Sequence, residues 1–315
     1  MARFIVRLMV ALKPRPVKPP KARGPRRRRR VIEWMAVATT MLLASAAASI
    51  WGADLVGFRL QHLTMVALVV GWMMVVGKAF NGHVEGLLID GRNRISLSRL
   101  QLFVWLVIVG CAFAIEVAHN FSLTDVVLGQ LKPDGVTVPP ELGLVMGVAT
   151  ASFVASPAIL SLKTRKTPSE SELADARRLV RDGSGIHPNS GRLYSRRPGA
   201  RARWSDLFRG EELENAGSAD PAKVQQFLVT FLLAVIYVAA LWRQWGVHHP
   251  DAPFEALPGL SEGGLALLGI SHAAYLGAKA TPQTPGGQGG VSSGDNARID
   301  TIALPPKAST KSAPV

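Results

Sequence analysis

The chain has 315 residues, of which 48% are hydrophobic, and a formal net charge of +14 at pH 7. Its charged residues fall in blocks separated by long uncharged stretches, which is typical of a multi-pass membrane protein and argues against two ordinary soluble domains. The single cysteine, Cys111, excludes an intramolecular disulfide framework and any cysteine-based zinc site.

The chain begins with a basic arm, residues 1–33. Within it, residues 13–30 read KPRPVKPPKARGPRRRRR, a Pro-rich and acid-free segment that cannot form a core and is expected to be extended and solvated. Two roles remain open for the arm. It is either a tether to anionic lipid headgroups, worth about 1 kcal/mol per basic residue near the surface, or a determinant of the orientation of the first helix. Nucleic-acid binding is less favoured.

Six stretches free of Asp, Glu, Lys and Arg follow the arm, each dominated by Leu, Val, Ala, Met, Phe and Trp. About 20 residues of α-helix cross the ~30 Å hydrocarbon core, and a terminal Lys or Glu can extend a shorter stretch by reaching the interface. The sequence therefore predicts an all-α integral membrane protein with six transmembrane helices rather than a soluble helical bundle. The stretches are 34–53, 60–77, 100–115, 142–162, 224–242 and 263–278.

The basic residues predict the orientation of these helices. If the N-terminus is cytoplasmic, 33 of the 36 Lys and Arg lie in cytoplasmic segments. This strong positive-inside bias predicts that both termini are cytoplasmic. The cytoplasmic segments are 1–33, 78–99, 163–223 and 279–315, and the three exceptions are Arg59, Lys132 and Arg243.

The long cytoplasmic loop, residues 163–223, has internal organisation. A capping-box pattern from Ser169 to Glu172 predicts a short exposed helix. Residues 183–203 are turn-rich and basic and are expected to be mobile, whereas 204–212 (WSDLFRGEE) gather aromatic and charged residues in an element that lies along the membrane or docks on the helix ends. The full division is a basic arm (1–33), three membrane hairpins (34–79, 100–162 and 224–279), two cytoplasmic loops (80–99 and 163–223) and a disordered Gly/Pro/Ser-rich tail (280–315).

The last four predicted helices form two similar hairpins. RLQLF at 99–103 and KVQQF at 223–227 open the two copies, and LVMGVATASFVAS at 144–156 aligns with ALLGISHAAYLGA at 266–278. Two hairpins that both begin on the cytoplasmic side are parallel repeats, related by an axis along the membrane normal.

Small residues recur every four positions on the two return helices. Such faces allow helix backbones to approach closely in lipid. We therefore expect the fourth and sixth helices to pack through these faces, and a Gly269→Leu change to disrupt assembly. The residues are Gly147, Ala151 and Ala155 in one helix and Gly269, Ala273 and Gly277 in the other.

The strings DGRNRISLSRLQLFVW, WSDLFRGEE followed by KVQQFLVTF, and LLGISHAAYLGAKA carry a resemblance over roughly residues 88–280. In these motifs the chain resembles a group of uncharacterised bacterial multi-pass membrane proteins. The resemblance implies a bacterial cytoplasmic membrane as the location. It implies no activity and no functional residues, because none is assigned to the group.

Ionisable residues inside membrane helices are costly, so each is a functional hypothesis. His272 lies in the middle of its helix, where it either lines a polar pocket or makes a structural hydrogen bond. Glu116 is expected near the outer interface, paired with His62 or Arg59. The four outer histidines, His62 among them, share no compact spacing, so no metal site is predicted. The candidate polar pocket consists of His272, Ser271, Tyr275, Thr150 and Ser152.

No phosphate-binding Gly-rich loop, catalytic acid pair or serine–histidine pair of usable geometry is present, so the sequence predicts no enzyme and no cofactor. The favoured function is a non-enzymatic scaffold, sensor or partner subunit that contacts a protein partner or a second copy through basic cytoplasmic loops. The alternative is a small transporter or channel built on the duplicated hairpins. Loss of solute flux in His272→Ala would favour transport, whereas loss of function with an intact fold on deletion of 183–212 would favour the partner role.

Overall fold

The residues described by the computed structural model include five long helices and one short 3-10 helix. They are α3 (Ala53–Asn81), α4 (Leu97–Ser122), α6 (Pro140–Thr164), η1 (Trp204–Leu207), α8 (Pro221–Val247) and α9 (Glu262–Ala280). The structure describes residues 32–37, 39–44, 53–123, 135–164, 170, 173–174, 191–196 and 201–281. Most of the basic arm, of the predicted helix after Ser169 and of the tail lie outside these residues.

Four helices are long and apolar enough to cross a membrane, which indicates an integral membrane protein. They are Gly57–Asn81 of α3, together with α4, α6 and α8. The fifth helix, α9, is shorter and packs against α6 and α8. The first predicted span, 34–53, overlaps a short apolar helix, Ile32–Ala44, and residues 45–52 lie outside the described residues. Of the six predicted transmembrane helices, the structure therefore supports four.

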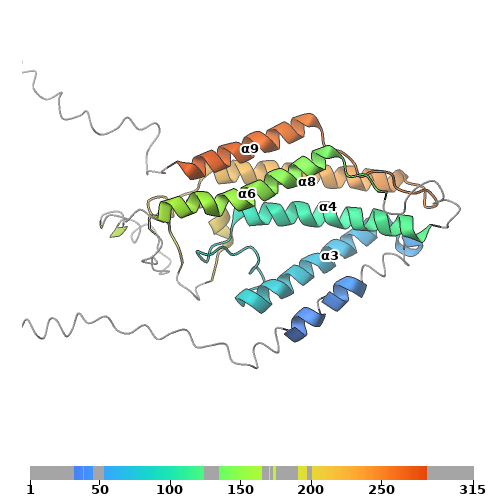
Figure 1. Cartoon of the computed structure of the whole chain (residues 1–315), viewed down its shortest axis with the longest axis horizontal. Coiled ribbons are helices and arrows are strands. Elements are labelled where there is room, and N and C mark those ends of the chain that lie inside the picture. The colour runs from blue at the N-terminus through green and yellow to red at the C-terminus, as the bar shows by residue number, and fades with distance from the viewer. Residues whose placement is uncertain are drawn as a thin grey trace, which may run out of the picture.

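The helices run alternately up and down, so their termini gather at two ends of the bundle (Figure 1). At one end α3, α6 and α9 finish while α4 and α8 begin; we call it the charged end. At the opposite end, which we call the histidine end, lie His119 near the end of α4 and His248 directly after α8.

The helix ends at the charged end include the first charged residues beyond each uncharged stretch. Thus α6 continues past Lys163, α9 continues past Lys279, and α8 begins before Lys223. The start of α8 follows the usual rules, because Asp220 accepts hydrogen bonds from two backbone N–H groups of the first turn and is followed by a proline at the first helical position.

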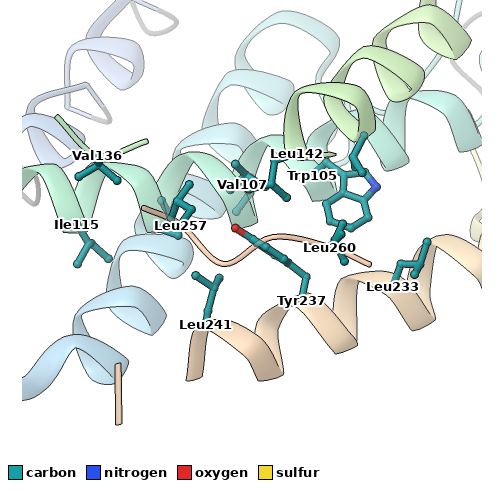
Figure 2. Packing of buried hydrophobic residues seen from close by; sticks show 14 of the residues in the cluster. Trp105, Val107, Ile115, Val136, Leu142, Leu233, Tyr237, Leu241, Leu257 and Leu260 are labelled. Carbon is teal, nitrogen blue, oxygen red and sulfur yellow. The ribbon is translucent and has the colours of Figure 1, made fainter. Parts of the chain in front are cut away.

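An extended segment, residues 253–260, enters the bundle ahead of α9 (Figure 2). Its Leu257 and Leu260 are buried against the core residues Tyr237 of α8 and Trp105 of α4. Backbone polar groups at membrane depth must be satisfied internally. Here the side chain of Asn120 bonds both the N–H and the C=O of Phe254, and Thr137 pairs with the backbone around Ala256.

Helices α6 and α9 pack against each other, but not through the predicted small-residue faces. The buried residues of α6 are Leu142, Val145, Ala149, Ser152, Ser156 and Leu160. A Cβ added at Gly147, Gly269 or Gly277 would meet no atom within 4 Å in the described chain, and Ala151 and Ala273 are exposed, with Ala155 half-buried. Most positions of the predicted small-residue faces therefore point outward, and other positions of α6 and α9 are the buried ones.

Candidate functional site

The two loops at the charged end fold onto the helix ends and onto each other. We call residues 82–96, 191–196 and 201–220 the cap. The backbone N–H of Arg196 donates to the carbonyl of Arg92 at 3.0 Å, which joins the two loops. The turn at 90–94 uses Asn93 with a positive φ of 58°, a conformation that asparagine tolerates better than most residues. The stretch 183–203, expected to be mobile, thus contains the buried Tyr194 and Arg196.

The carboxylate of Glu211 lies at the centre of the cap with three cations around it. Its Oε1 lies 3.0 Å from Lys223 Nζ and 2.9 Å from Lys279 Nζ, and its Oε2 lies 2.9 Å from Arg92 Nη2. Burial alone would raise the pKa of Glu211, but these cations outweigh it and hold the pKa well below the ordinary value. We call these four residues the Glu211 cluster.

A second buried ion pair joins η1 to the rest of the cap. Arg196 donates to both carboxylate oxygens of Asp206, at 3.3 and 2.8 Å. Burial opposes ionisation of Asp206, but the bond from Arg196 and the charge of Arg94 lower its pKa. Arg94 is itself buried and donates to the carbonyl of Gly210 at 2.7 Å. Because these charged side chains are buried and bonded to other residues of the cap, the cap is a folded unit rather than a flexible linker.

Lys163 connects α6 to the cap. Its Nζ lies 2.7 Å from Glu212 Oε1 and donates to the carbonyl of Thr281, just after α9, at 2.7 Å. Lys279 of α9 in turn bonds Ser156 of α6 and donates to the hydroxyl of Tyr275. Glu211 and Glu212 therefore connect both hairpins, α4–α6 and α8–α9, through ion pairs.

The predicted polar pocket is only partly assembled. Ser271 donates to Gln226 at 2.6 Å, and Tyr275 bonds Lys279 rather than His272. Thr150 is exposed and bonds its own helix. His272 is buried, and neither of its ring nitrogens has a hydrogen-bond partner among the described residues; the same holds for the hydroxyl of Ser152.

A buried amide network lies between α4 and α8. Gln101 donates to Thr230 at 2.8 Å and to the carbonyl of Gln226 at 3.3 Å. In the second predicted repeat the buried glutamine is Gln226. Gln225, which aligns with Gln101 in the sequence, is exposed.

The predicted Glu116–His62 pair is replaced by contacts to one tryptophan. The indole N–H of Trp245 donates to Glu116 Oε1 at 3.0 Å, and the ring of His62 lies 4.8 Å from that of Trp245, centroid to centroid. Arg59 also has a different partner, because it bonds the carbonyl of Trp242 and lies over the Trp242 ring. Trp245 occupies the space between the two predicted partners.

Sequence reasoning missed the Glu211 cluster. Its signal is Glu211–Glu212, the one adjacent pair of acidic residues in the loop sequence 163–223, together with a single lysine at the charged end of each of α6, α8 and α9. Comparisons with protein-family models, curated proteins and solved structures gave no match. The resemblance to the bacterial membrane group therefore stays a prediction.

Proposed function

We propose that the protein is a non-enzymatic component of the cell membrane, a scaffold or partner subunit, that binds a cytoplasmic protein through its cap. In this proposal the charged end and both termini face the cytoplasm, in agreement with the distribution of Lys and Arg along the chain. A second copy of the chain is the other candidate partner.

The observation that supports this proposal is the ionic connection between the hairpins. A rocking carrier moves one repeat against the other around a central site. Lys163 belongs to the α4–α6 hairpin, and Lys223 and Lys279 belong to the α8–α9 hairpin. Such movement would therefore separate either Glu212 from Lys163 or Glu211 from its two lysines. Breaking a buried ion pair on one side leaves an uncompensated charge, at a cost of about 3–5 kcal/mol. A fixed bundle that holds a rigid cap suits a scaffold better than a carrier.

The cap presents an exposed basic and aromatic patch that can bind a partner. The side chain of Arg201 is 77% exposed and Trp204 is 57% exposed, while Arg203 between them is also exposed. Trp and Arg are enriched among the residues that dominate protein–protein binding energy. The positive charge of this patch favours a partner with an acidic surface.

Co-purification from native membranes in lipid nanodiscs tests the proposal. The wild-type chain is expected to retain a reproducible second protein, and the double variant Arg201→Glu/Trp204→Ala to lose it. Lys78→Glu, at an exposed position at the same end of the bundle, is the matched control for the charge change. Retention of the same partner by the double variant, or a chain that purifies alone, would contradict the proposal.

Transport is the second candidate, because the buried His272 has both ring nitrogens without a partner in the described chain. Buried polar groups are normally hydrogen-bonded, so such a side chain is a candidate for contact with a solute or ion. If the protein transports a solute, His272→Ala should abolish its flux in proteoliposomes while leaving insertion intact. Unchanged flux would exclude a role for His272 in transport.

A further inference from the structure

A cavity of about 290 Å³ opens at the charged end, between the start of α4, the second half of α6 and the end of α9. The α6 side contributes three apolar residues, Phe153, Pro157 and Leu160, and three hydroxyl residues, Ser156, Ser161 and Thr164. The remaining wall is mostly polar and carries three cations and one carboxylate. Its polar residues are Arg92, Arg99, Lys279, Asp90, Ser96 and Ser98.

The side chains in and behind this wall carry an excess of positive charge. This group of described side chains contains six cations and three carboxylates, which leaves three positive charges without a carboxylate partner in the group. Uncompensated like charges in a low-dielectric environment are unfavourable and attract an anion. The cations are Arg92, Arg94, Arg99, Arg196, Lys223 and Lys279, and the carboxylates are Asp90, Asp206 and Glu211.

Two arginines at the cavity have hydrogen-bonding capacity that the described residues do not use. Arg99 donates only to the carbonyls of Leu87 and Ile89, at 3.2 and 2.9 Å, and the described chain gives it no carboxylate partner. The Nη1 of Arg92 is buried and has no hydrogen-bond partner among the described residues, although its Nη2 bonds Asp90 and Glu211. Both residues line the cavity. The Arg92 guanidinium is held in place by Asp90 and Glu211, so Arg99 is the arginine that can turn donors toward a ligand.

We propose that this cavity binds a phosphate group. Arginine donors and serine hydroxyls around a basic cavity match the several oxygens of a phosphate, and the volume suits a phosphate with a short ester group. The apolar lining residues of α6, Phe153, Pro157 and Leu160, offer a surface on which the ester group would pack. The phosphate can belong to a phospholipid headgroup or to a soluble phosphate compound. This site is separate from the Arg201–Trp204 patch and does not depend on partner binding.

Thermal unfolding of the full chain in a phosphate-free maltoside detergent tests the proposal. Inorganic phosphate and phosphatidic acid are titrated separately, with sodium chloride at equal ionic strength as the reference. A melting temperature that rises with either ligand beyond the chloride reference is expected. A rise in melting temperature with inorganic phosphate would show that a soluble phosphate is sufficient for binding. A rise with phosphatidic acid alone would show that the ligand is a lipid headgroup.

Variants test whether the rise in melting temperature is caused by binding in this cavity. Arg99→Gln removes a cation without breaking an ion pair, and loss of its charge-assisted bond should weaken binding about ten-fold or more. Lys78→Gln, the matched control, should titrate like the wild type. Ser98→Ala supplies a second test if Arg99→Gln fails to fold, and should also weaken binding. Equal titrations in all variants, or no response beyond chloride, would overturn the proposal.

Discussion

At the scale of single residues, Glu211 allows two lysines to be buried side by side. Lys223 and Lys279 approach the same carboxylate oxygen, and each also bonds a neutral oxygen, the carbonyl of Arg209 or the hydroxyl of Tyr275. Without the carboxylate the two ammonium groups would repel each other in a poorly solvated environment. Glu211 is therefore the residue whose loss should affect the cap most.

Glu211→Gln is expected to lower the free energy of unfolding by about 3–5 kcal/mol, because it leaves two buried lysines without their counter-ion. Chemical denaturation in detergent micelles measures the change. Glu262→Gln, at an exposed position in the first turn of α9, is the matched control and should change stability by less than about 0.5 kcal/mol. Similar stability of both variants would contradict the role assigned to Glu211.

The lowered pKa of Glu211 predicts a dependence of stability on pH. Its ordinary value is 4.5, and a group whose pKa is lower in the folded state stabilises the fold above its unfolded pKa. The stability difference between wild type and Glu211→Gln should therefore shrink as the pH falls below about pH 4.5. Melting curves across this range measure it. If the stability difference instead grew as the pH fell below about 4.5, the assigned direction of the Glu211 pKa shift would be wrong.

At the scale of helices, two glycines make opposite predictions. A Cβ at Gly77 of α3 would lie 2.8 Å from the carbonyl oxygen of Val84 and 2.9 Å from the nitrogen of Gly86, whereas Gly269 has no such neighbour. Gly77→Ala should therefore cost about 1–3 kcal/mol of stability, and Gly269→Leu less than about 0.5 kcal/mol. Unfolding measurements on both variants check this. A strong loss from Gly269→Leu would restore the sequence-based expectation and point to a second copy of the chain on that face.

Several elements could be predicted from the sequence because lipid imposes a simple composition on them. The uncharged stretches of α3, α4, α6 and α8 correspond to the four helices that can cross a membrane. The faces of those helices could not be predicted, since nearly every position is apolar and hydropathy does not distinguish a lipid contact from a helix contact. For the same reason Trp245 could not be recognised as the partner of Glu116.

The candidate site was harder to predict for a different reason. Charged residues in a loop are normally solvated, so Arg94, Arg196 and Asp206 give no sign in the sequence that they are buried. Their burial depends on the meeting of two loops more than 100 residues apart, as in the bond from Arg94 to Gly210. Only the acidic pair Glu211–Glu212 stands out in the sequence.

At the scale of the whole molecule, the cap connects every part of the described bundle. Deletion of 183–212, which the sequence suggests as a change that spares the fold, would remove Asp206, Glu211 and Glu212 together. We therefore expect this deletion to destabilise the bundle. Substitutions on the exposed patch, Arg201 and Trp204, are the better test of partner binding.

The central claim is that ion pairs at the charged end hold the two hairpins in one fixed arrangement. Spin labels at Gly143→Cys on α6 and Val247→Cys on α8, in a Cys111→Ser background, report the distance between the hairpins at the histidine end; both positions are exposed. Pulsed electron paramagnetic resonance in nanodiscs should give one narrow distance distribution, which broadens when Glu211→Gln is added. Two distances in the otherwise unmodified chain would contradict the claim and favour a transporter that alternates between states.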